Sequence, residues 1–441
     1  MVALLLGAAP AAAAARPTSR PPISSPGRPV TSAGRRCPRG TVGQPTVPAP
    51  PAVRRPPPSG PGWCTAGQSW SPRWAVTTPA TPPTPRRSSS TSTAPSTASK
   101  GRTAPAGLRR PGRPGYGLDA YLAAYDPAAW GRVAPSGPLE EARVRSVTNQ
   151  TRQTQINIGP NTTIVGLRGA RLTGLTLMID RASNVIVRNL TLVDARDCFP
   201  AWSPTDGEAG NWNSQYDQIS VRRSENVWVD HNTFTDGDNP DSAQPVHFGR
   251  PYQVHDGSLD VTHTASLVTA SWNRFTGRDK LLLIGSSNTV GPDVGRLRVT
   301  LHHNLFDGVL QRLPRVRFGQ VDVYNNHYRL GGDGFQYALG VGVQSAIYAQ
   351  SNFFTLDASV EPADLLYDWG GAALTERGSW VCQGDGPARP VDLLAAYNAT
   401  HDPDLAADAG WTPTLRHGPV LPAPLVPVLV GSLAGAGRLP L

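Results

Sequence analysis

The stretch Leu301–Tyr328, LHHNLFDGVLQRLPRVRFGQVDVYNNHY, decides the fold of this chain. It holds two short alternations of apolar and polar residues, Leu301–Phe306 and Val316–Tyr324, and each is accompanied by an Asn with an aromatic residue two places later. Between the alternations lie three arginines close together around a proline: Arg312, Arg315 and Arg317. Repeating strands that present fixed cations on one side indicate a scaffold that holds an acidic substrate.

The same Asn-x-aromatic pattern recurs along the chain, at Asn232-x-Phe234, Asn273-x-Phe275, Asn304-x-Phe306, Asn326-x-Tyr328 and Asn352-x-Phe354. The spacings are 41, 31, 22 and 26 residues. The short spacings suit one turn of a parallel β-helix, and the longer ones suit a turn with an inserted loop. The runs between them are β-branched and bounded by Gly, Asn and Asp, with almost no helical intervals that could serve as βαβ crossovers.

We therefore predict an all-β fold, a right-handed parallel β-helix in which the Asn amides bond from coil to coil beside stacked aromatic rings. A β-sandwich is the alternative, although the two-residue hairpin turns that it needs are absent. Short capping helices are predicted at Leu118–Tyr125, from Ser136 onward and at Val391–Tyr397. The Pro- and Gly-rich tail after the last of these is expected to run back over the coils.

The first 118 residues differ sharply from the rest. They contain 16 Arg and Lys and no Asp or Glu, whereas Asp119–Leu441 has 25 basic and 32 acidic residues, a net charge of −7. The basic pI therefore belongs to the leader, and we expect no nucleic-acid binding by the folded part. Residues 1–16 resemble a signal peptide with an Ala-x-Ala end. Residues 17–117 are of low complexity, and a disordered linker, an arm that binds anionic polymer and an out-of-frame translation all remain open. Residues 118–441 form the predicted β-helix domain.

Four cysteines, Cys37, Cys64, Cys198 and Cys382, form no C-x-x-C pair, which argues against a zinc site. A Cys198–Cys382 bridge is compatible with export, and the sequence leaves it open. After the signal-like segment no apolar run is long enough to span a membrane, so we expect no membrane insertion.

Several side chains are candidates for chemistry. Lys280 is one of only two lysines against 39 arginines, which suggests a compact point charge for a substrate carboxylate rather than a chance surface lysine. Asp217, Asp256 and Asp260 can converge from neighbouring coils as oxygen ligands of a hard cation such as calcium, or can serve as ordinary turn residues. Three histidines, His231, His302 and His303, sit beside Asn in strands and are predicted to pack within the coils rather than bind zinc.

The chain from about Leu118 resembles the pectate lyases of polysaccharide lyase family 1. The resemblance rests on the segments FPAWSPTDGEAGNWNSQYD (199–217), VWVDH (227–231), HDGSLD (255–260), RDKLLLIGSS (278–287) and QRLPRVRFGQVDVYNNHY (311–328). It implies a secreted, monomeric enzyme that cleaves α-1,4-linked polygalacturonate by calcium-assisted β-elimination and releases 4,5-unsaturated oligogalacturonides.

The resemblance also assigns roles to residues. It implies that Asp217, Asp256 and Asp260 bind Ca²⁺, that Arg312 is the catalytic base, and that Lys280 and Arg317 hold substrate carboxylates, while Asp230 and His231 are structural. The alternation of a strand cannot choose Arg317 over Arg315, because both face the same way. Two other functions stay open: a pectin lyase that acts on methyl-esterified pectin without calcium, and an inactive β-helix that binds acidic polysaccharide.

Overall fold

The computed structural model describes residues 115–167, 169–416 and 418–439. The predicted signal peptide, residues 1–16, lies outside the described residues, as does nearly all of the low-complexity segment 17–117. In the described part, no helix combines the length and the apolar character needed to cross a membrane.

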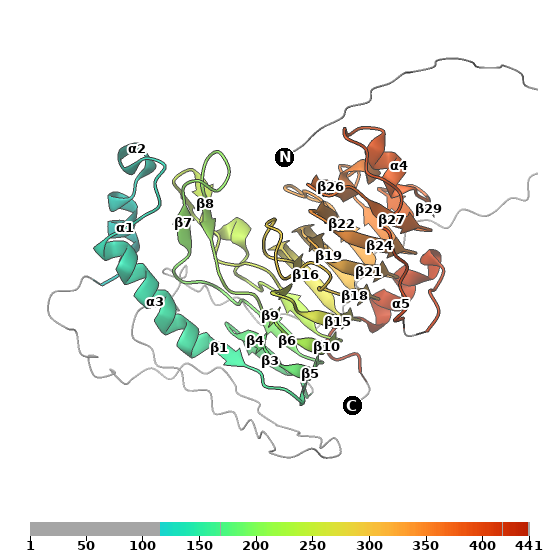
Figure 1. Cartoon of the computed structure of the whole chain (residues 1–441), viewed down its shortest axis with the longest axis horizontal. Coiled ribbons are helices and arrows are strands. Elements are labelled where there is room, and N and C mark those ends of the chain that lie inside the picture. The colour runs from blue at the N-terminus through green and yellow to red at the C-terminus, as the bar shows by residue number, and fades with distance from the viewer. Residues whose placement is uncertain (1–114, 168, 417, 440–441) are drawn as a thin grey trace, which may run out of the picture. The chain divides into compact units, whose positions relative to one another are not determined.

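Three long sheets dominate the described residues, and consecutive strands of the chain pass from one sheet to the next (Figure 1). The first sheet contains β1 (Gln155–Asn157), β4 (Thr176–Asp180), β9 (Ile219–Arg222), β14 (Leu259–Thr262), β17 (Leu283–Ile284), β20 (Arg315–Val316), β23 (Leu339–Gly342) and β26 (Leu366–Trp369). The second contains β2 (Thr162–Val165), β5 (Ser183–Arg188), β10 (Glu225–Asp230), β15 (Ser266–Ser271), β18 (Val299–His302), β21 (Gln320–Tyr324), β24 (Ala346–Gln350) and β27 (Leu374–Arg377).

The third sheet contains β3 (Arg171–Thr173), β6 (Thr191–Val193), β11 (Thr233–Thr235), β16 (Arg274–Lys280), β19 (Leu305–Gln311), β22 (His327–Leu330), β25 (Phe353–Leu356), β28 (Trp380–Gln383) and β29 (Arg389–Pro390). Within the three sheets the described pairs are parallel, except β28 with β29. One strand from each sheet makes one coil, so the predicted parallel β-helix is confirmed and the sandwich is wrong. Inward-facing Val, Ile, Leu and Phe of the three sheets form one continuous core.

The predicted asparagine ladder is present at the turn between the second and third sheets. The five amides are fully buried, and the Nδ2 of each of the first four donates to the Oδ1 of the next at 3.0–3.2 Å: Asn232, Asn273, Asn304, Asn326 and Asn352. The aromatic residues two places later stack with ring centroids 4.6–5.3 Å apart: Phe234, Phe275, Phe306, Tyr328 and Phe354. The ladder therefore fixes the register of the coils that carry the site.

We expect Asn304→Ala to destabilise the protein strongly. The Asn304 amide donates to Asn326 and to the carbonyl of Ala270, and it accepts from the Asn273 backbone N–H. Its loss leaves buried groups unpaired, at about 1–3 kcal/mol for each group. Thermal unfolding would measure this against Asn149→Ala, an exposed helix position where little change is expected. Equal melting temperatures for the two variants would contradict the ladder's role.

The described helices lie outside the coils. They are α1 (Leu118–Ala124), α2 (Pro127–Trp130), α3 (Pro138–Thr154), α4 (Leu393–Asn398) and α5 (Val426–Leu433), with short 3₁₀ segments η1 (Asp241–Ala243), η2 (Pro362–Leu365) and η3 (Ala423–Leu425). The predicted helices at Leu118–Tyr125 and from Ser136 are thus confirmed as α1 and α3, and that at Val391–Tyr397 as α4.

The N-terminal helices pack on two long insertions, one between β6 and β9 and one between β11 and β14, and each insertion carries a small hairpin. These are β7 (Ala201–Ser203) with β8 (Asn211–Asn213), and β12 (Val246–His247) with β13 (Arg250–Pro251). Tyr121 of α1 is fully buried with its ring 6.2 Å from that of Trp212, in an aromatic cluster that also contains Val254. The cluster therefore anchors the segment leading to Asp256.

The C-terminal tail runs back over the coils, as predicted. The N–H of Leu421 donates to Asn325, α5 packs on Leu305 and Phe353, and Gly437 donates to Asn189 at 2.7 Å. These contacts cross from a late coil to an early one.

The two cysteines of the β-helix are too far apart to be bridged to each other. Cys382 lies in β28, and β28 is six strand steps from β6 in the third sheet, roughly 29 Å at about 4.8 Å per step. Cys198 follows β6 by five residues, which span at most about 18 Å. The remaining distance exceeds the roughly 7 Å Cα separation that a disulfide tolerates. Both sulfurs carry disulfide bonds, and Cys37 and Cys64 lie outside the described residues.

Candidate active site and metal centre

Three carboxylates converge on the outer side of the first sheet. One oxygen from each of Asp217, Asp256 and Asp260 lies within 4.8 Å of the others. Asp217 and Asp260 are 7% and 6% exposed, and Asp256 is half-buried. The register explains the meeting, because Ile219 of β9 pairs with Leu259 of β14 and so brings the residues before the two strands together.

Gly257 sits inside this acidic triad, which is Asp217, Asp256 and Asp260. Its N–H donates to Asp217 Oδ1 at 3.0 Å, and a Cβ at this position would lie 2.3 Å from Asp260 Oδ1 and 2.9 Å from Asp217 Oδ1. The N–H of Leu283 donates to Asp260 Oδ1 at 3.1 Å. The carboxylates are thus held around a space that only glycine keeps clear.

The triad is electrostatically strained by its own negative charge. Burial, and then the charge of Asp256, raises the pKa of Asp217 to about 7. Burial and the charge of Asp217 likewise raise the pKa of Asp260 well above its usual value. Three oxygen donors that repel one another in a confined space fit a hard divalent cation such as calcium.

Arg312 faces the triad. It follows β19 with a left-handed backbone (φ 63°), and its Nη1 lies 3.4 Å from Asp256 Oδ1. Its side chain is 16% exposed. Burial lowers the pKa of Arg312, but the charges of Asp256 and Asp260 outweigh burial and raise the pKa above the usual value.

Arg315 and Arg317 share a strand face but have different surroundings. The guanidinium of Arg315 lies 3.7 Å from the ring centroid of Trp369, which covers it. Gly340, opposite Arg315 in the register, leaves room for this contact, since a Cβ there would lie 3.1 Å from Trp369 Cδ1 and 3.2 Å from Arg315 Cγ. Stacking therefore covers one face of the Arg315 guanidinium and does not use its N–H donors.

Arg317 keeps donors free for a ligand. Its Nε donates to Asn288 Oδ1 at 2.5 Å and its Nη1 to the carbonyl of Gly285 at 2.9 Å, so three of the five N–H groups of a guanidinium have no acceptor among the described residues. Burial, and then the charges of Arg315 and Arg312, lowers the pKa of Arg317 to about 10.

Lys280 lies on the neighbouring coil. It ends β16 and pairs in register with Gln311, the residue before Arg312. Its side chain is 8% exposed, and its charge is among the causes that lower the pKa of Asp241. The strand register therefore places Lys280 next to the chain segment that leads into Arg312.

The predicted packing role of the histidines agrees with their contacts. The ring of His231 stacks on Trp272 at 5.9 Å, Trp272 stacks on His303 at 4.3 Å, and His302 stacks on Tyr324 at 5.0 Å. Neither group of possible metal ligands found among the described residues includes them. Asp230 is fully buried between Arg188, Ser271 and His231, consistent with the structural role expected for it.

Sequence reasoning missed a second group of charges, directly behind the triad, of which all but Asp194 are buried. We call it the buried charge network: Asp194, Asp236, Asp241, His255 and Arg278. Burial alone would lower the pKa of His255, but its hydrogen bonds to Asp194 and Asp241 raise the pKa to about 9. Two members could have been noticed in the sequence, since His255 is next to Asp256 and Arg278 lies two residues before Lys280. Nothing in the sequence distinguished the three Asp residues of the network.

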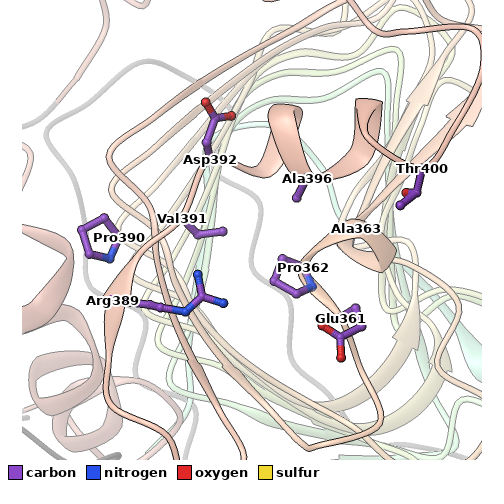
Figure 2. A pocket seen from close by; sticks show the side chains of 9 residues that line it. All are labelled: Glu361, Pro362, Ala363, Arg389, Pro390, Val391, Asp392, Ala396 and Thr400. Carbon is purple, nitrogen blue, oxygen red and sulfur yellow. The ribbon is translucent and has the colours of Figure 1, made fainter.

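A surface recess elsewhere shares no residue with the triad. Figure 2 shows it between η2, β29 and α4, with Glu361, Arg389 and Asp392 as its charged side chains. The segment η2 directly precedes β26, the last strand of the first sheet, and β29 and α4 follow it. The recess therefore lies at the C-terminal end of the β-helix. The convergence of carboxylates and arginines, and not this recess, marks the candidate active site.

Comparison with known proteins gives one consistent family. Residues 136–373 match the family model described as pectate lyase. A pectate lyase of Bacillus subtilis (strain 168) is 43% identical over 340 residues, which cover 76% of this chain and 78% of that protein. Among solved structures, a thermostable pectate lyase has 46% identity and a TM-score of 0.71, and a pectate lyase bound to a hexasaccharide has 42% identity and a TM-score of 0.69. Each structural match covers 74% of this chain and 80% of the other.

Proposed function

Since this chain belongs to the pectate lyase family, we propose that it cleaves α-1,4-linked polygalacturonate by calcium-assisted β-elimination, with Arg312 as the base. The observation that carries the proposal is the meeting of three carboxylates with Arg312, Arg317 and Lys280 on adjacent coils. A calcium-independent enzyme on methyl-esterified pectin would need neither the triad nor arginines free for carboxylates, so the arrangement favours the unesterified substrate.

The triad is the proposed holder of calcium, because its donors are all oxygen and Gly257 keeps the space between them clear. When bound, calcium would neutralise the triad and draw electron density from a substrate carboxylate, which acidifies the proton at C-5. The chain's own side chains supply the remaining functions: positioning of the uronates and transfer of the proton.

Arg317 and Lys280 are proposed to hold substrate carboxylates. The three free N–H groups of Arg317 suit a two-pronged contact with a carboxylate, and Lys280 offers a compact charge. Since they belong to different coils, they would bind different carboxylates of an extended chain.

Arg312 must lose a proton before it can act as a base. Asp256 and Asp260 oppose this loss, and the positive charges of Arg315 and Arg317 favour it. Once neutral, Arg312 takes the proton from C-5, the bond from C-4 to O-4 breaks as the double bond between C-4 and C-5 forms, and the departing O-4 takes a proton from solvent. Alkaline pH would help because it removes the proton from Arg312.

We expect purified protein to produce a steady rise in ultraviolet absorbance from unsaturated uronide when it meets polygalacturonate and calcium at alkaline pH. A chelator should stop the rise, and calcium added back should restore it. Highly methyl-esterified pectin serves as the contrasting substrate. Folded protein that gives no signal with polygalacturonate and calcium would refute the proposal.

Export and a monomeric state complete the proposal. The disulfide bonds of Cys198 and Cys382 support export, since structural disulfides are rare in reducing compartments. Mass spectrometry of the N-terminus of secreted protein would test the signal peptide at residues 1–16, and light scattering would test the monomer. Protein that stays in the cell, or a stable dimer, would contradict these parts.

A further inference from the structure

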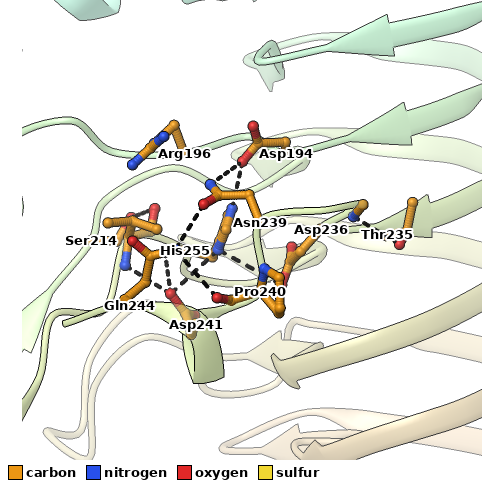
Figure 3. A network of polar contacts seen from close by, with 12 residues as sticks. Asp194, Arg196, Ser214, Thr235, Asp236, Asn239, Pro240, Asp241, Gln244 and His255 are labelled. Carbon is orange, nitrogen blue, oxygen red and sulfur yellow. Dashed lines mark hydrogen bonds and ion pairs between the residues drawn. The ribbon is translucent and has the colours of Figure 1, made fainter. Parts of the chain in front are cut away.

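The buried charge network, Asp194, Asp236, Asp241, His255 and Arg278, lies against the segment that carries the triad. In Figure 3, His255 points between Asp194 and Asp241. Its Nε2 is 2.9 Å from Asp194 Oδ1 and its Nδ1 is 3.3 Å from Asp241 Oδ1. Arg278 is 3% exposed, and its Nη1 lies 2.7 Å from Asp236 Oδ1. Each carboxylate of the network thus faces a nitrogen of His255 or Arg278.

This pairing argues against a second metal site in the network. Oxygens of Asp236 and Asp241 and a nitrogen of His255 do lie within 4.8 Å of one another, a spacing that a metal ion could bridge. However, the guanidinium of Arg278 already occupies one side of Asp236, and His255 is bonded through both ring nitrogens. A cation would have to displace these contacts, so the network is better explained as a support.

The support reaches the triad through the backbone. Nη2 of Arg278 donates to the carbonyl of Asp256 at 3.0 Å and to that of Gly257 at 3.3 Å. On the other side of this turn, Asp241 Oδ1 accepts from the N–H of Val254 at 2.8 Å and from that of His255 at 3.3 Å. The segment 254–257 is therefore held at several points by buried side chains.

The held segment contains Asp256, a member of the triad that strand pairing does not fix. Asp260 lies within β14, but Asp256 and Gly257 lie in the turn before it. The Gly257 N–H, in turn, orients Asp217. A shift of this turn would move the carboxylate of Asp256 and remove the hydrogen bond to Asp217 together.

We propose that Arg278, held by Asp236, is a positioning residue that sets the spacing of the calcium-binding triad through the backbone of Asp256 and Gly257. This inference rests on the proposed calcium site. Arg278 reaches both carbonyls and Asp236 at once with its planar fork, which a lysine ammonium cannot do. Groups that orient metal ligands from behind typically contribute about 10- to 100-fold in metal affinity.

The test is calcium titration calorimetry on folded wild type, Arg278→Lys and Asp236→Asn, with turnover measured against calcium concentration. We expect calcium affinity to fall by about 10- to 100-fold in both variants. The calcium concentration for half-maximal turnover should rise in parallel, while kcat at saturating calcium stays near that of wild type. A purely structural role would lower the melting temperature and leave the calcium affinity of the folded protein unchanged.

Arg274→Lys is the matched control. Arg274 lies on the same strand, but it is 39% exposed and pairs with Asp307, so its replacement should leave calcium affinity as in wild type. If Arg278→Lys does not fold, Asp236→Asn carries the test alone. If either folded variant binds calcium as tightly as wild type, the positioning role is wrong, but the proposed calcium site is unaffected. Failure of wild type to bind calcium would overturn the proposed calcium site, and the inference with it.

Discussion

Arg312→Lys is expected to lower kcat by about 10²- to 10⁴-fold, the usual contribution of a positioned acid or base. Lysine keeps the positive charge near Asp256, so the buried carboxylates stay compensated and the fold should survive. It cannot, however, place a nitrogen where the guanidinium now lies, because the shorter ammonium has a different geometry. Initial rates on polygalacturonate at saturating calcium would measure the loss.

The control for this prediction is Arg329→Lys, the same replacement at a site where the side chain is 44% exposed and pairs with Asp307. Its activity should match wild type. If Arg312→Lys keeps more than a tenth of wild-type kcat, the base has been assigned to the wrong residue. Circular dichroism of both variants separates a lost base from a lost fold.

Asp217→Asn is expected to change metal-free stability and calcium binding in opposite directions. The amide keeps the shape that accepts from the Gly257 N–H but removes a charge from the crowded triad. Calcium affinity should fall by more than the roughly 10- to 100-fold typical of a supporting group, since a ligand charge itself is lost. In chelator, however, the variant should melt at a higher temperature than wild type at pH 8.

The sign follows from the pKa of Asp217. Burial and Asp256 raise it from 3.8 to about 7 in the folded protein, so the folded state holds its proton longer than the unfolded state does. Stability therefore falls as pH rises between these values, because the folded state must give up a proton that the unfolded state has already lost. Melting curves of metal-free wild type at pH 4, 6 and 8 should show this fall, and Asp217→Asn should lessen it. If the difference in melting temperature between wild type and Asp217→Asn stays the same at all three pH values, the carboxylates of the triad do not repel one another as described.

The two predictions describe one trade-off. In the metal-free protein the triad raises the pKa of Arg312 and strains its own carboxylates, so the same charges weaken both the fold and the base. A divalent cation that neutralised the proposed site would remove both costs. Calcium dependence of stability and of turnover would then share one midpoint.

The repeating pattern of the sequence was enough to predict the architecture. An Asn followed two places later by an aromatic residue recurs in five coils, and stacking of identical positions is the arrangement that satisfies buried amides at every repeat. The arginine-rich segment and the HDGSLD segment also suggested a candidate site, and the family resemblance assigned the roles, because the two segments lie about fifty residues apart and the repeat alone does not show that they meet.

Contacts between distant segments could not be predicted in this way. Alternation within a strand places Arg315 and Arg317 on one face, and only the structure shows that Trp369, more than fifty residues later, stacks on the first while Asn288 accepts from the second. The same applies to Cys198 and Cys382, which the strand order keeps apart.

By itself, the sequence determined the stacked coils and the residues that meet along them, since a repeat fixes its own neighbours. The tertiary structure alone decided which charges are buried and which charges they pair with. Asp194, Asp236 and Asp241 lie in long inserted segments, and they reach His255 and Arg278 only because those segments fold back behind the triad. Burial and pairing of a charge depend on the whole fold, and no local pattern of residues encodes them.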